Sequence, residues 1–198
     1  MTAPAFDPAR TAVLAMDCQA AIVAAYVKPP EPYLERAVSV LAAARRARMA
    51  VIHVQVGFRP GMPEINARHG LFGTIKSDPQ RQQMFEGTGG AVHPALGPEP
   101  GDLVVTKRRV SAFTGSDLDV LLRANEIETM VMFGIATSGV VLSTLLEASD
   151  ADYRLFVVKD CCADLDQRLH AALVEGLFPS RATVVTTREF EESLASQG

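Results

Sequence analysis

Cysteine is scarce in this chain of 198 residues, and neither cysteine nor histidine is spaced like a disulfide or metal site. The three cysteines are Cys18, Cys161 and Cys162, an odd number with two adjacent members, which does not suit a disulfide framework. No C-x-x-C or H-x-x-x-H spacing occurs, and the four histidines are scattered. We therefore expect neither a metal ion nor another cofactor.

A basic excess and long apolar runs are also missing. The 19 basic residues face 23 acidic ones, a net charge of -4, whereas nucleic-acid and membrane-surface proteins show a basic imbalance. No apolar run approaches the roughly 20 residues that span a bilayer. The first ten residues, MTAPAFDPAR, lack the basic-then-apolar pattern of a signal peptide. We expect a cytoplasmic protein with a small-molecule substrate and no nucleic-acid or membrane partner.

The chain does have an ordinary globular composition and a regular alternation of segment types. Hydrophobic residues make up 48% and charged residues 21%, and the length suits one domain over residues 1–198. Short β-branched runs, mostly apolar throughout, are typical of parallel strands covered on both faces. Six such runs predict strands: 11–17, 50–56, 102–107, 129–135, 154–160 and 182–187.

Amphipathic segments separate these strands. Residues 32–48, 116–126 and 163–179 predict helices, the second capped by Ser116 and the third by Asp164 and ending before Pro179. Alternating strands and helices with right-handed crossovers favour a doubly wound α/β fold. Residues 57–100 are the exception, because they are rich in Gly and Pro with only a short helical possibility. Such a long loop in a compact domain is usually functional, so we interpret it as a lid.

Polar residues stand where the predicted strands end. In open α/β sheets ligands bind beyond the carboxyl ends of the strands, near the point where strand order reverses. Asp17 and Gln19 follow the first strand, Gln55 and Arg59 follow the second, and Lys107 ends the third. A carboxylate and an ammonium in one cleft bias each other's ionisation and can exchange a proton with a substrate. The alternative is structural: Asp17 caps a helix, and Lys107 belongs to a solvated basic turn.

The corner GIATSGVVLSTL, residues 134–145, raises the question of a nucleophile. Ser138 is one candidate, but the G-x-S-x-G pattern is missing and no histidine is near in sequence, so we expect it to cap the following helix. Cys18 is another. Because successive side chains of a strand point to opposite faces, Cys18 is expected to pack away from a cleft that Asp17 faces.

Three stretches together resemble the isochorismatase-like hydrolases, also called the cysteine hydrolase superfamily. They are VLAMDCQ at the first strand, VVTKRRVSAF at the third, and VMFGIATSGVVLSTLLEASDADYRLFVVKDCCAD across the fourth and fifth. The resemblance runs from about residue 10 to 187. It implies a three-layer α/β/α fold with a six-stranded parallel sheet, and a homodimer or homotetramer.

The amidases of that family use an Asp–Lys–Cys triad, which the resemblance carries over in part. Its acid and lysine match Asp17 and Lys107, and its threonine matches Thr144. In the pattern G-[VI]-A-T-x-x-C, a cis peptide corresponds to Ile135-Ala136 and the cysteine to Val140. Valine cannot form a thioester, so the amidase mechanism is not available. The metal ligands of the nicotinamidase branch have no counterpart in HVQVGFRPGM either.

The family also contains a non-covalent chemistry, cleavage of a vinyl ether. There the aspartate protonates the enol-ether carbon, water adds to the oxocarbenium ion, and pyruvate leaves. The resemblance implies Asp17 as the acid, Lys107 as a cation that positions Asp17 or binds a carboxylate, and Gln55 as the glutamine of that branch. On the lid, Arg59 or Arg68 could grip an anionic group bidentately. Cysteine-free members carry glycine at the position of Val140 and a GVYAH corner, from which GIATS departs.

Three hypotheses follow from these residues. The leading one is a non-covalent hydrolase of a small anionic or enol-ether-like metabolite, with Asp17 and Lys107 as catalytic residues. The others are a catalytically silent ligand-binding member of the family, and an amidase with an unconventional nucleophile. We predict nine substrate-binding residues: Gln19, Gln55, Arg59, Phe113, Ile135, Ala136, Ser138, Gly139 and Val140.

Overall fold

Six parallel strands form the central sheet of the structure, a computed structural model that describes residues 6–196. Their spatial order is β3-β2-β1-β4-β5-β6. The strands are β1 (Thr11–Met16), β2 (Ala50–Val56), β3 (Leu103–Lys107), β4 (Thr129–Ile135), β5 (Arg154–Ala163) and β6 (Thr183–Val185). The predicted α/β fold with six parallel strands is therefore confirmed, with β5 longer and β6 shorter than their sequence patterns indicate.

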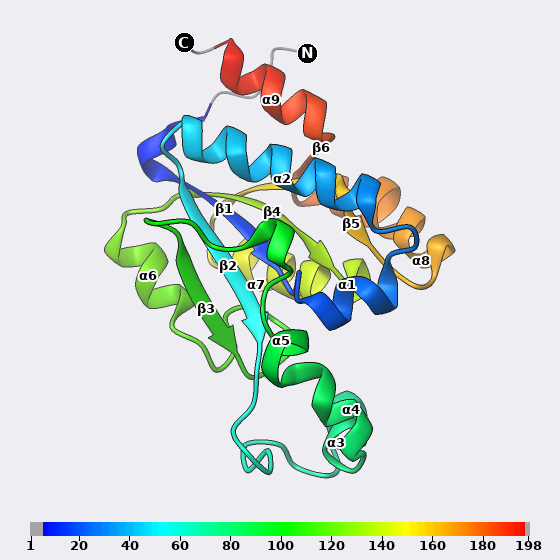
Figure 1. The fold of residues 1–198 in the computed structure, drawn as a ribbon. Helices are drawn as coiled ribbons and strands as arrows, with labels where there is room; N and C mark the ends of the chain where they lie inside the picture. The colour runs from blue at the N-terminus through cyan, green and yellow to red at the C-terminus, as the bar shows by residue number, and fades with distance from the viewer. Residues whose placement is uncertain (1–5, 197–198) are drawn as a thin grey trace.

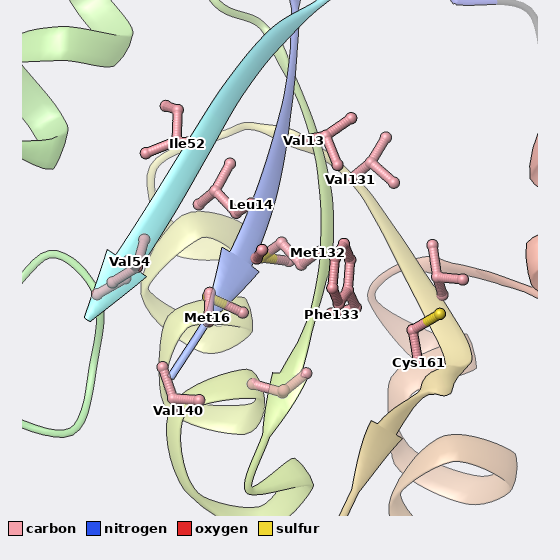
Figure 2. Close-up of a cluster of buried hydrophobic side chains, with 14 of the residues drawn as sticks. Val13, Leu14, Met16, Ile52, Val54, Val131, Met132, Phe133, Val140 and Cys161 are labelled. Atoms are coloured by element: carbon pink, nitrogen blue, oxygen red, sulfur yellow. The ribbon is translucent and has the colours of Figure 1, made fainter. Parts of the chain in front are cut away.

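The two central strands are buried along their whole length. Every residue of β1 and β4 is buried, because helices cover both faces of the sheet and leave no polar side to these strands. Figure 2 shows side chains of this apolar core, with Leu14, Met16 and Phe133 among them and Val140 at the carboxyl ends of the strands. The core thus extends to the edge at which β1 and β4 end.

Helices lie on both faces of this sheet (Figure 1). Figure 1 shows α2 and α9 covering one face and α6 and α7 the other, which makes three layers. Within residues 6–196 no helix is long and apolar enough to cross a membrane. The helices are α1 (Ala20–Tyr26), α2 (Glu31–Arg46), α3 (Gly70–Lys76), α4 (Pro79–Gln82), α5 (Gly87–Gly90), α6 (Leu118–Ala124), α7 (Leu142–Asp150), α8 (Gln167–Ala171) and α9 (Thr187–Ala195).

The strand order reverses between β1 and β4. From β1 the chain proceeds outward to β2 and β3, and then crosses to β4 on the other side of β1. Crevices beyond the carboxyl ends of two such strands are the usual ligand sites of open α/β sheets. A ligand is therefore expected to bind near the segments that follow β1 and β4.

The predicted helix at 163–179 is wrong in its start and its end. Helix α8 begins at Gln167, and its N-cap is Asp166, which accepts hydrogen bonds from two backbone N–H groups of the first turn. Asp164 is not the cap, because its carboxylate accepts from Ser138 instead. The chain continues as a π-helical turn over Ala172–Leu177 and a 3-10 turn over Phe178–Ser180, so it passes through Pro179.

The segment 57–100, named the lid segment below, is more ordered than its composition predicts. It holds helices α3, α4 and α5 and two 3-10 turns, Gln83–Phe85 and Pro94–Leu96. Figure 1 shows α3, α4 and α5 beyond the carboxyl ends of β2 and β3. The expectation of a segment with only a short helical possibility is therefore wrong. Helices α4 and α5, with four residues each, are too short for amphipathic periodicity to reveal them.

Candidate active site

Asp17 and Lys107 form a buried ion pair at the carboxyl edge of the sheet. Their Oδ2 and Nζ atoms lie 2.9 Å apart, and the two residues are 7% and 1% exposed. Asp17 follows β1 with a φ of 53°, a left-handed conformation that Asp tolerates better than most residues. Lys107 ends β3, two strands or about 10 Å away, so only a long side chain reaches past β2.

The electrostatics of the pair differ from those of a surface salt bridge. Burial raises the pKa of Asp17, and the neighbouring Lys107 ammonium opposes this without reversing it. The Lys107 ammonium also donates to the Arg109 carbonyl, at 2.9 Å. The Oδ1 atom of Asp17 is buried and makes no hydrogen bond within the described residues. This carboxyl group therefore holds its proton to higher pH than an exposed aspartate and keeps one oxygen available.

The turn after β4 passes very close to β1. Gly134 has a φ of 148°, and a Cβ there would lie 2.0 Å from the Met16 carbonyl oxygen, so only glycine fits. A cis peptide follows between Ile135 and Ala136, at the position that the resemblance implies. The next residues form a π-helical turn, Thr137–Val141, which presents Val140 beside the ion pair.

Ser138 faces away from the pair. Its backbone N–H and its hydroxyl both donate to Asp164 Oδ2, at 2.8 and 2.6 Å. The helical turn begins at Thr137, so the expectation that Ser138 caps a helix from Gly139 or Val140 is wrong. The hydroxyl instead ties this turn to the end of β5. Within the described part of the chain its hydroxyl bonds Asp164, not a histidine or lysine that would make it a nucleophile.

The three cysteines are buried and lie outside the cavity lining. Cys18 Sγ lies 3.3 Å from the Tyr33 hydroxyl, and burial raises the pKa of its thiol to about 12. Burial likewise raises the pKa of Cys162 to about 12 and that of Cys161 further. Because the thiolate is the reactive form, none of the three is poised for attack.

A cavity of about 320 Å³ opens above the Asp17–Lys107 pair. Its polar lining is sparse: besides the pair it contains Tyr26, Thr74 and Arg81. The other lining residues are apolar, apart from the backbone of Gly139. They come from α1 and the ends of β2 and β4, from the segments that follow β3 and β4, and from the lid segment: Ile22, Val56, Leu71, Phe72, Ile75, Met84, Phe85, Val110, Ile135, Ala136 and Val140.

Six of the eleven predicted site residues line this cavity. They are Asp17, Lys107, Ile135, Ala136, Gly139 and Val140. All six stand at the ends of β1, β3 and β4 or in the turn that follows, where the sheet topology alone brings them together.

The other five predicted residues lie outside the lining. Gln19 is fully buried, and its amide bonds the Val56 N–H and the Val56 and Gly90 carbonyls, so it joins the strand ends to the lid segment. Gln55 donates to Thr106, and Phe113 lies against Tyr153. Ser138 donates to Asp164. Arg59 is exposed and pairs with Glu64, and Arg68 is exposed as well.

The cavity residues that sequence reasoning missed come mostly from the lid segment. The segment supplies seven of them, and the arginine at the cavity is Arg81 rather than Arg59 or Arg68. One signal was present: Leu71, Phe72 and Ile75 have the spacing of one helical face within GLFGTIK. No pattern marks Arg81.

Comparison with known proteins places the chain in a family. The isochorismatase domain model matches residues 11–189. The chain belongs to the isochorismatase family. Two amidohydrolases are among the relatives of this isochorismatase-family protein. It is 33% identical to a ureidoacrylate amidohydrolase of Methylorubrum extorquens, over 97% of this chain and 86% of that one. It is 29% identical to the maleamate amidohydrolase of Pseudomonas putida, over 81% and 74% respectively.

Solved structures agree with the architecture of this isochorismatase-family hydrolase. An isochorismatase family protein from Burkholderia thailandensis superposes with a TM-score of 0.85 at 29% identity, over 98% of this chain and all of that one. A cysteine hydrolase from Pseudomonas syringae pv. phaseolicola shares the fold with a TM-score of 0.83 at 24% identity, over the full length of both chains.

Proposed function

We propose that this isochorismatase-family protein hydrolyses a small anionic, enol-ether-like metabolite by acid catalysis, without a covalent intermediate. One observation carries the proposal. The buried carboxyl of Asp17, held by Lys107 at the floor of an apolar cavity, keeps Oδ1 without a hydrogen-bond partner among residues 6–196, and Val140 lines the same cavity. An acid without a nucleophile suits proton transfer rather than acylation.

The reaction begins with protonated Asp17, whose pKa is raised by burial. The carboxyl donates its proton to the terminal carbon of the C=C–O unit, and the double-bond electrons form the new C–H bond. The oxygen lone pair stabilises the resulting oxocarbenium ion. Water adds to the oxygen-bearing carbon of this ion and loses a proton to the Asp17 carboxylate, which restores the acid. In the resulting hemiketal the bond to the alkoxy oxygen breaks, the hydroxyl proton passes to that oxygen, and an alcohol and a ketone leave.

Lys107 acts on this cycle through Asp17. Its ammonium fixes Oδ2 at 2.9 Å, which directs the carboxyl, and its second bond to the Arg109 carbonyl fixes the ammonium in turn. When Asp17 is ionised, the nearby positive charge stabilises the carboxylate that the oxocarbenium step creates. The apolar walls exclude bulk water from the intermediate.

The names of the relatives suggest a related substrate with a different bond. The ureidoacrylate and maleamate amidohydrolases are named for small unsaturated acids that carry an amide. A small unsaturated carboxylate is therefore a reasonable substrate class here too. Amide hydrolysis through a thioester, however, needs a sulfur atom where this chain has Val140. Neither Cys18 nor Ser138 replaces it, since both lie outside the cavity lining.

Carbon protonation provides the test. Purified protein is incubated in D₂O with a panel of isopropenyl ethers whose alkoxy group carries a carboxylate, and the acetone product is followed by proton NMR. We expect acetone with one solvent deuterium in a methyl group at the earliest time points, with acetone incubated alone as the control for exchange. Asp17→Asn is expected to abolish turnover, and Asp119→Asn, a half-buried acid outside the cavity lining that pairs with Arg123, to leave it unchanged.

Three results would contradict the proposal. Full turnover by Asp17→Asn would show that Asp17 is not the general acid. Failure of every ether, combined with ligand-induced thermal stabilisation, would favour the binding protein without turnover. Amide hydrolysis that stops on thiol alkylation would favour a cysteine amidase.

A further inference from the structure

The charged groups of the cavity are divided between its floor and its mouth. Among the lining residues that the structure describes, the cations are Lys107 and Arg81. Lys107 is 1% exposed and already bonded to Asp17 and to the Arg109 carbonyl. The Arg81 side chain is 56% exposed, so it stands at the solvent side. The wall between them is mostly apolar.

Arg81 is presented by a short, well-capped helix of the lid segment. Asp78 caps α4 by accepting hydrogen bonds from the backbone N–H groups of Gln80 and Arg81. Its other oxygen lies 3.2 Å from Arg81 Nε, and Arg81 Nη1 donates to the Thr74 hydroxyl at 3.4 Å. These contacts use two of the three guanidinium nitrogens. A guanidinium carries five N–H donors, so donors remain for an anion.

We infer that the substrate is a monoanion with an apolar body, whose carboxylate binds Arg81 while its reacting end contacts Asp17. This inference rests on the proposed function for the identity of the reacting end. The apolar body follows from the walls, where Phe72, Phe85 and Ile75 contribute from the lid segment. A second charge along these walls would lose its hydration without gaining a partner, so a dianion is disfavoured.

Arg81 is not one of the arginines that the sequence analysis named for anion binding. Arg59 points into solvent and pairs with Glu64, and Arg68 is exposed outside the lining. Of the lid arginines described, Arg81 alone combines access to solvent with a place in the cavity wall. Its planar donor set suits a carboxylate better than a lysine does.

A matched pair of unreactive probes tests the inference by binding alone. The affinities of 3-phenylpropanoate and of its neutral analogue 3-phenylpropanamide are measured by calorimetry on the full chain. We expect Arg81→Gln to lower the affinity for the carboxylate about tenfold or more, because hydrogen bonds to charged groups are stronger than those between neutral groups. The affinity for the amide should change less than about twofold. Arg81→Lys should recover part of the loss.

Three further variants control for the lid itself. Asp78→Asn keeps a capping oxygen but removes the competing charge, so carboxylate binding should stay equal or tighten. Arg59→Gln and Arg68→Gln should leave the affinities for both probes unchanged. Equal weakening of both probes by Arg81→Gln would overturn the inference. A selective loss of carboxylate affinity in Arg59→Gln or Arg68→Gln would also overturn it. The same holds if the wild type does not bind the carboxylate, or does not bind it more tightly than the amide.

The same probes separate this inference from the proposed function. Asp17→Asn should retain the preference for the carboxylate, because Arg81 is untouched. If that preference holds while no ether is hydrolysed, the proposed reaction fails and the anion site stands. If ethers are hydrolysed with one methyl deuterium but Arg81→Gln leaves the KM of anionic ethers unchanged, the anion site fails and the reaction stands.

Discussion

The floor and the lid of the cavity are built in opposite ways. The floor is made of residues at the ends of β1, β3 and β4, where a buried ion pair and a glycine contact fix positions closely. The lid segment consists of helices of four to seven residues that contribute mostly apolar side chains. The buried ion pair thus stands on the sheet, while much of the apolar cavity wall comes from locally folded turns.

Polar side chains fasten the lid segment to the floor at both ends. Gln19 bonds the Gly90 carbonyl at one end, and Arg108 bonds the Gly57 carbonyl at the other. Inside the segment, Lys76 donates to the carbonyls of Met62 and Ile65, at 2.9 and 2.7 Å. These bonds hold the segment in place without a long helix. Its middle part is then free to present apolar residues and Arg81 to the cavity.

The largest expected effect concerns a floor glycine. Gly134→Ala puts a Cβ 2.0 Å from the Met16 carbonyl oxygen in a backbone conformation that side chains rarely adopt. We expect a loss of more than about 5 kcal/mol, with the Tm falling by more than about 10 °C, or failure to fold. Gly70→Ala in the lid, with open space around it, should change the Tm little or raise it. If thermal unfolding shows the same change in Tm for both variants, the proposed difference between floor and lid is wrong.

The next effect concerns a buried lid residue. Phe72 is 4% exposed and meets the Phe58 ring edge-on at 5.3 Å. Phe72→Ala should cost about 3–5 kcal/mol of local stability and speed amide hydrogen exchange within 57–100 far more than in β1. Val140→Ala, a floor change of the same kind, should leave exchange in the lid segment unaltered. Uniform acceleration across the sheet would show that lid and floor unfold together.

A smaller effect is the pH dependence that Asp17 adds to stability. Its folded-state pKa lies above the ordinary aspartate value of 3.8, so the folded protein binds this proton more tightly than the unfolded chain. The contribution of Asp17 is therefore complete below about 3.8 and declines as pH rises through the folded pKa, by at most about 1.4 kcal/mol per pH unit. Urea unfolding from pH 4 upward should show wild type losing stability relative to Asp17→Asn. A relative gain would reverse the sign of the shift.

The smallest effect is expected from the thiols. With a pKa of about 12, Cys18 is ionised in about one molecule in 10,000 at pH 8. Treatment with a thiol reagent should label the folded protein slowly and leave turnover unchanged, whereas all three cysteines should react in urea. Rapid labelling of one thiol with parallel loss of activity would place a reactive sulfur at the floor.

Sequence patterns predicted the floor better than the lid for a physical reason. Buried parallel strands show continuous apolar runs, so their ends, and with them Asp17 and Lys107, could be located from the sequence. The resemblance added Val140 and the Ile135-Ala136 peptide. Gln19 and Gln55 were also correctly placed at strand ends, but which way their amides point depends on neighbouring backbone carbonyls far away in the chain.

Apolar patterning located the six parallel strands, and with them the acid and the lysine at their ends, while three motifs indicated the family. Three features are visible only in the folded chain: Lys107 reaches past β2 to Asp17, Asp164 holds Ser138 instead of capping α8, and Arg81 lines the cavity. These are contacts between segments distant in sequence. Burial, charge and hydrogen bonding at one point in space select them, and no local pattern records that selection.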